Sequence, residues 1–197
     1  MNETAFKIRF GRRALVTGAT SGIGREFADQ LAALGVNLLV VSRRQDALDD
    51  MAQTLTEKAG IEARTLALGA PEFLASLLAA VDDPDIGLFV SNAGADHGGA
   101  LLRIPRAPLR AMQRPNAASR LDVVHGFGTR CLDRRKAMGL ICVSSTASPQ
   151  ATPLVANYAG AKALCDDPRR SPQQRIARRP HEKGRPRPSE NRTPHRK

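Results

Sequence analysis

The sequence contains no tryptophan and a single tyrosine, and aromatic residues make up only 4% of its 197 residues. Proteins that bind single-stranded nucleic acids stack bases on aromatic side chains, so this scarcity argues against that class. Long apolar runs are missing as well, since no stretch approaches the roughly 18 residues that a membrane-spanning helix needs. We therefore predict no membrane partner.

Cysteine is scarce too, with three residues at positions 131, 142 and 165 and no C-x-x-C pair. The four histidines are scattered without metal-ligand spacing. These patterns exclude a disulfide scaffold and a structural zinc site, and we predict no metal. The first eleven residues lack the apolar run of a signal peptide, so we expect a cytoplasmic protein.

Acidic residues are outnumbered, at 19 against 30 lysines and arginines, which gives a net charge of +11. Such an excess suggests an acidic partner such as nucleic acid, but most of it lies at one end. Residues 165–197 contain nine arginines, two lysines, six prolines and four acids, which is +7 of the total. A segment so poor in apolar residues cannot offset its ordering entropy. We predict a folded domain at 1–164 and a disordered basic tail at 165–197.

Within residues 1–164, short apolar runs alternate with stretches of helical period. The predicted strands are 14–16, 36–41, 63–68, 86–90 and 139–143, and the helices are 25–34, 45–58, 72–81 and a long stretch at 109–137. Strands that are continuously apolar are covered by helices on both faces. The alternation predicts an α/β fold, a doubly wound parallel sheet built from right-handed βαβ units.

The first predicted strand leads directly into a glycine-rich turn at residues 17–24. Glycines in this pattern let the backbone approach a pyrophosphate, and the N–H groups at the start of the next helix are free to bind it. Glycine also occurs in turns of purely structural function. The assignment to cofactor binding therefore depends on the position of this turn between a buried strand and a helix. The turn predicts cofactor contacts from five residues: Gly18, Ser21, Gly22, Ile23 and Gly24.

The second strand ends at Arg43 and Arg44, where folds that prefer NAD place an acid for the ribose 2′-hydroxyl. A guanidinium can bind a 2′-phosphate with paired hydrogen bonds, whereas an acid would repel it. We therefore predict NADP(H) in preference to NAD. The alternative is that both arginines are simply solvated at a helix start.

The only tyrosine, Tyr158, stands four residues before Lys162. On a helix the two side chains share one face, about 5–6 Å apart at Cβ. An ammonium beside a phenol favours the phenolate, which suits Tyr158 to general acid/base catalysis.

Taken together, these motifs resemble those of the short-chain dehydrogenase/reductase family, whose domain is Rossmann-like. TGxxxGxG stands at 17–24, NAG at 92–94 and YxxxK at 158–162, in the order of the family and over about residues 10–164. Ser145 lies thirteen residues before Tyr158, the spacing of the family's catalytic serine. Asn116 falls where the family has its fourth catalytic residue.

The resemblance implies an NADP-dependent oxidoreductase acting on a small-molecule carbonyl or alcohol. Tyr158 would exchange a proton with the substrate oxygen, and Lys162 would support the phenolate and bond the nicotinamide ribose. Ser145 would hold the substrate oxygen and Asn116 a relay water. The NAG residues Asn92, Ala93 and Gly94 would lie beside the cofactor.

Several positions depart from the family pattern. The segment after the third strand, 68–71, lacks the acid that contacts the adenine, and Pro115 would remove a hydrogen bond from the helix that carries Asn116. Proline 168 would end the YxxxK helix within about two turns, and no candidate for a sixth strand or a substrate lid follows. The fifth strand would form an exposed apolar edge. We do not expect the chain to turn over substrate on its own.

Three interpretations remain open from the sequence. The first is a truncated oxidoreductase whose tail is an out-of-frame translation, and the second is a catalytically inert nucleotide-binding remnant. The third is a nucleic-acid-associated protein acting through its basic tail, for which no recognition motif is present. A homo-oligomer would use the two long helices that flank the fifth strand, and both are interrupted in this sequence.

Overall fold

The computed structural model describes residues 3–67, 73–95, 98–134, 138–150 and 152–163. The predicted tail at 165–197, the segment 68–71 and the helix end at Pro168 lie outside the described residues. No helix in the described part of the chain is long and apolar enough to cross a membrane.

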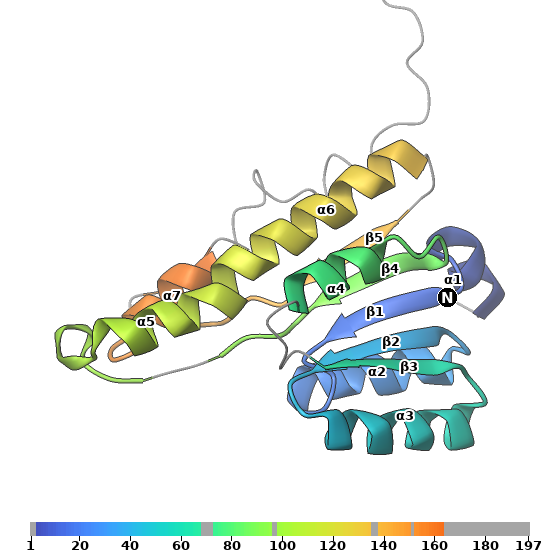
Figure 1. Ribbon diagram of the computed structural model, residues 1–197, viewed down its shortest axis with the longest axis horizontal. Coiled ribbons are helices and arrows are strands. Elements are labelled where there is room, and N and C mark those ends of the chain that lie inside the picture. The colour runs from blue at the N-terminus through green and yellow to red at the C-terminus, as the bar shows by residue number, and fades with distance from the viewer. Residues whose placement is uncertain (1–2, 68–72, 96–97, 135–137, 151, 164–197) are drawn as a thin grey trace, which may run out of the picture.

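Five parallel strands form one sheet in the order β3-β2-β1-β4-β5. This order reverses direction beside β1, as in a doubly wound sheet, and confirms the predicted fold class. The central strand β1 is buried along its whole length, because it has a neighbour on each side and helices on both faces (Figure 1). The strands are β1 Arg13–Thr17, β2 Asn37–Ser42, β3 Ala63–Ala67, β4 Ile86–Ser91 and β5 Gly139–Cys142.

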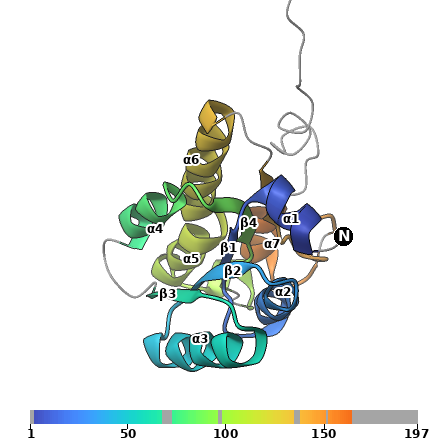
Figure 2. The ribbon, with the colours of Figure 1, turned by 90° about the vertical axis from the view of Figure 1, so that its right-hand side faces the viewer.

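The helices form two layers around the sheet (Figures 1 and 2), with α2 and α3 on one face and α4 and α6 on the other. Right-handed crossovers that run from β1 to β3 keep α2 and α3 together, and the reversal at β4 moves the later helices across. The helices are α1 Glu3–Phe10, α2 Gly22–Ala33, α3 Gln45–Ala59, α4 Phe73–Val81, α5 Arg106–Gln113, α6 Ser119–Arg134 and α7 Ala156–Ala163.

Each face of the sheet contributes to its own hydrophobic core. On one face Val16 and Val40 pack against α2 and α3, and Phe6 of α1 joins them at 5% exposure. On the other face Leu15 packs with Phe89, whose ring meets that of Phe127 on α6 edge to face at 5.6 Å. Alternate residues of β1 thus serve opposite cores, which fixes the register of the strand.

Two predicted boundaries were wrong. The helix after the glycine turn begins at Gly22 rather than Arg25, because the glycines themselves form its first turn. The predicted stretch at 109–137 is three pieces, since a π-helical turn at Arg114–Ala118 separates α5 from α6. The wider turn accommodates Pro115, which has no N–H to donate, and keeps Asn116 inside the fold at 0% exposure.

The fifth strand is covered more than expected. Leu140 is buried at 7% exposure, and Ile141 and Cys142 are half-buried. In the described part of the chain β5 pairs with β4 alone.

At the amino ends of the strands, a buried arginine joins three of them. Arg13 of β1 bonds Glu62, just before β3, at 2.6 Å and also pairs with Asp83, just before β4. Arg64 bonds the same glutamate at 2.6 Å, and this hydrogen bond is the main cause that lowers the pKa of Glu62. Burial acts to raise the pKa of Asp83, but the N–H of Asp85 and the Arg13 guanidinium outweigh it and hold the pKa below the ordinary 3.8.

This cluster predicts that the protein loses stability in acid. A carboxylate whose pKa is lower in the folded state stabilises the fold above its unfolded pKa, and that contribution disappears as pH falls through the folded value. We expect the free energy of unfolding, measured in urea, to fall between about pH 5 and pH 3. In Arg13→Met the loss over this range should be smaller, because the two carboxylates no longer have that partner. Parallel curves for the two proteins would contradict this assignment.

Candidate active site

A crevice opens at the carboxyl end of the sheet, where the segments after β1 and β4 part in opposite directions. The Thr17 hydroxyl connects the two segments where they leave the sheet. It donates to Val90 O at 3.3 Å and accepts from the N–H groups of Asn92 and Ala93, both at 3.0 Å. Ligands of doubly wound sheets bind at this topological switch point. The fold therefore positions the glycine turn and the loop after β4, residues 92–95, on opposite sides of one opening. We call the second segment the NAG loop.

The glycine turn lies tightly against the NAG loop. The Asn92 side chain donates to Thr17 O at 3.1 Å and Gly18 O at 3.3 Å. A Cβ on Gly24 would lie 2.2 Å from Gly18 O, so only glycine fits there. Ser21 precedes α2 and lines the cavity, and its side chain makes no capping bond to the first N–H groups of that helix. This arrangement suits a phosphate group.

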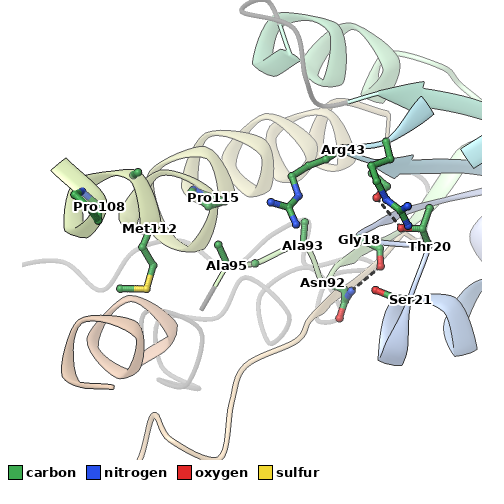
Figure 3. A pocket seen from close by; sticks show the side chains of 14 residues that line it. Gly18, Thr20, Ser21, Arg43, Asn92, Ala93, Ala95, Pro108, Met112 and Pro115 are labelled. Atoms are coloured by element: carbon green, nitrogen blue, oxygen red, sulfur yellow. Dashed lines mark hydrogen bonds between the residues drawn. The ribbon is translucent and has the colours of Figure 1, made fainter. Parts of the chain in front are cut away.

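The crevice contains a cavity of about 940 Å³. Gly18, Thr20 and Ser21 lie at one end and Pro108 and Met112 at the other (Figure 3). Its remaining lining residues are Ser42, Arg43, Arg44, Asn92, Ala93, Gly94, Ala95, Ala111 and Pro115. This volume lies at the upper end of the range for cofactor pockets. One end of the cavity is polar and has two guanidinium groups, which suits a phosphorylated dinucleotide.

The predicted cofactor residues are only partly brought together. Gly18, Ser21, Arg43, Arg44 and the NAG residues line the cavity, and both arginines are exposed at its edge. Gly22, Ile23 and Gly24 form the first turn of α2 and are not among the lining residues, and Ile23 is 60% exposed.

The Tyr158–Lys162 pair lies on α7, outside the lining of the cavity. The Lys162 ammonium lies 5.8 Å from the centre of the Tyr158 ring, and the two side chains share a helix face as predicted. Lys162 is 3% exposed and donates to Val143 O at 3.0 Å. Ser145 accepts a hydrogen bond from the N–H of Ala147 at 3.2 Å.

Asn116 connects the π-helical turn to the NAG loop. Its side-chain nitrogen donates to Ala95 O at 2.6 Å and Met112 O at 2.9 Å, and its oxygen accepts from the N–H of Ala95 at 3.3 Å. Helix α5 is joined to α7 through Asn157, which donates to Leu109 O at 3.0 Å and also bonds Gln113. The helix that carries Tyr158 is thereby positioned by α5 and by the π-helical turn.

Several residues of the site were not foreseen from the sequence. Thr20 and Ser42 bond each other at 2.8 Å and join the glycine turn to the end of β2. Arg120 is 6% exposed and donates to Ala93 O and Val143 O, both at 3.0 Å. The sequence could have indicated Arg120 by its position four residues after Asn116, which places both side chains on the same helix face.

The sequence matches the short chain dehydrogenase family over residues 12–178. The chain belongs to this family. The matched range extends past residue 164, where the composition changes, and the domain boundary there stays a prediction. The fold of this short-chain dehydrogenase is similar to that of a family member from Sphingobium yanoikuyae in complex with NADPH, with a TM-score of 0.73 and 24% identity over 77% of this chain and 60% of that one.

Two relatives indicate the range of functions. A very-long-chain 3-oxoacyl-CoA reductase from Podospora anserina is 34% identical over 78% of this chain and 47% of its own length. An inactive hydroxysteroid dehydrogenase-like protein 1 from Pongo abelii is 30% identical over 80% of this chain and 49% of its own length. The chain thus spans about half the length of these relatives.

The contact between the NAG loop and two catalytic candidates gives a direct test. A Cβ on Gly94 would lie 2.6 Å from the Asn116 side-chain oxygen and 3.2 Å from the Lys162 ammonium. We expect Gly94→Ala to lower the free energy of unfolding by about 1–3 kcal/mol, as overpacking does elsewhere. Gly98→Ala is the matched control, since its Cβ would meet only Leu154 O at 3.9 Å. Equal urea midpoints for the two variants would contradict the packing described.

Proposed function

We propose that this short-chain dehydrogenase binds NADP(H) and transfers hydride between it and a carbonyl or alcohol substrate. The observation that carries the proposal is the cavity in which Arg43 and Arg44 lie across from the open N-terminus of α2. The helix end suits the pyrophosphate and the guanidinium groups suit a 2′-phosphate. The 3-oxoacyl-CoA reductase among the relatives supports a ketone as the group reduced.

In this proposal, the glycine turn with Arg43 and Arg44 would hold NADPH, which would supply the hydride for the carbonyl carbon. Tyr158 donates its phenolic proton to the carbonyl oxygen, which leaves an alcohol and a phenolate. The Lys162 ammonium, 5.8 Å from the Tyr158 ring, supports that phenolate electrostatically. Ser145 orients the substrate oxygen by a hydrogen bond. Asn116 is fully buried, and its bonds to Ala95 hold the loop beside the cofactor site in place.

A second candidate function is nucleotide binding without turnover. It is favoured by the lining of the cavity, which includes the glycine turn and the arginines but neither Tyr158 nor Ser145. The inactive dehydrogenase-like relative supports the same alternative. The two functions share the cofactor site and differ in whether Tyr158 acts on a substrate.

The cofactor assignment predicts a selective loss in the double variant Arg43→Ala, Arg44→Ala. Removing the guanidinium groups should raise the Kd for NADPH about 10- to 100-fold, in line with the value of charged hydrogen bonds, and leave the Kd for NADH nearly unchanged. Nicotinamide fluorescence measures both constants. Arg12→Ala is the control, because Arg12 is exposed at the opposite end of the sheet. Equal losses for NADPH and NADH would refute 2′-phosphate recognition.

The catalytic assignment predicts the effect of Tyr158→Phe. The variant keeps the ring beside Lys162 but lacks the proton, so carbonyl reduction with NADPH should fall at least about 100-fold, the usual contribution of a general acid. The Kd for NADPH should stay within a factor of about two. If the wild-type chain binds NADPH but shows, against a panel of ketones, no reduction that this substitution abolishes, nucleotide binding without turnover is favoured.

A further inference from the structure

Two buried cations converge on one main-chain carbonyl. Val143 O accepts a hydrogen bond from Arg120 at 3.0 Å and another from Lys162, also at 3.0 Å. Arg120 comes from α6 and Lys162 from α7, so the carbonyl joins two helices that are distant in sequence. Cations at this depth are stable only where hydrogen-bond acceptors surround them.

The same guanidinium also bonds the NAG loop. Its second terminal nitrogen donates to Ala93 O at 3.0 Å, so one rigid group spans the exits of β4 and β5. Val143 continues the strand pairing with its own N–H, which donates to Ser91 O at 3.0 Å. Because β5 is only four residues long, its exit depends on such side-chain contacts for a fixed position. The planar fork of arginine can hold two acceptors at once, which an ammonium group does less rigidly.

The π-helical turn explains how Arg120 reaches this place. Asn116 lies in the turn and Arg120 follows one helical turn later, so both side chains point inward, at 0% and 6% exposure. Asn116 bonds Ala95 and Arg120 bonds Ala93, which are alternate residues of the same loop.

We infer that Arg120 is a positioning residue: it fixes the position of the Lys162 ammonium through their shared contact with Val143 O. The inference rests on the proposed function and on the role that the family resemblance implies for Lys162, a bond to the nicotinamide ribose. A lysine head at the end of four methylene groups is placed only by its hydrogen-bond partners. Without the guanidinium, the link between the carbonyls of Val143 and Ala93 is lost, and only the main-chain bond from Val143 to Ser91 holds the β5 exit. The Lys162 ammonium then loses its fixed position.

A double-mutant cycle on the full chain tests this inference, with the Kd for NADPH as the readout. We expect Arg120→Met to raise that Kd about tenfold in the wild-type background and less than about twofold when Lys162→Met is already present. Arg130→Met is the matched control, because Arg130 lies on the same helix and pairs with Asp82 away from the site. It should leave the Kd within about a factor of two.

Equal effects of Arg120→Met in both backgrounds would overturn the inference, because a purely structural arginine would act independently of Lys162. Arg120→Lys keeps the charge but cannot span both carbonyls as rigidly, so its Kd should lie between those of the wild type and Arg120→Met. If thermal unfolding shows that Arg120→Met does not fold, the cycle is run with Arg120→Lys and the same criterion applies. A wild-type chain that fails to bind NADPH would overturn the proposed function and this inference with it.

Discussion

The Thr17 hydroxyl connects the two chain segments on which the cavity depends. It stands at the end of β1, donates to Val90 O near the end of β4, and accepts from the N–H groups of the first two residues of the NAG loop. With three hydrogen bonds on one small buried group, the strands are fixed where their following segments must part. The glycine turn, the arginines and the NAG loop then face one another across the opening.

Charge is arranged differently at the two ends of the sheet. At the amino ends, the two terminal nitrogens of Arg13 pair with the carboxylates of Glu62 and Asp83, which joins three strands and serves stability. At the carboxyl ends, Arg120 and Lys162 are buried against main-chain carbonyls. The exposed guanidinium groups of Arg43 and Arg44 at the cavity edge add positive charge at this end, which suits an anionic cofactor.

The sequence was most informative where a pattern has one physical explanation. Continuously apolar strands alternating with helices predicted the doubly wound parallel sheet, and the glycine turn before a helix was recognised from its position after the first strand. The helix α1 was missed, because its pair Phe6 and Phe10 stands among charged residues and gives little amphipathic signal. Pro115 suggested a broken helix, whereas the neighbouring contacts of Asn116 stabilise a π-helical turn. The burial of Arg120 depends on carbonyls that only the fold brings together.

The central claim is that the cavity recognises a 2′-phosphorylated adenosine. Calorimetric titration of the wild-type chain with adenosine 2′,5′-bisphosphate and with 5′-AMP isolates that recognition from the nicotinamide half and from catalysis. We expect saturable binding at one site per chain, at least about tenfold tighter for the bisphosphate, and weakened by salt. Equal affinity for the two nucleotides, or no binding of either, would contradict it.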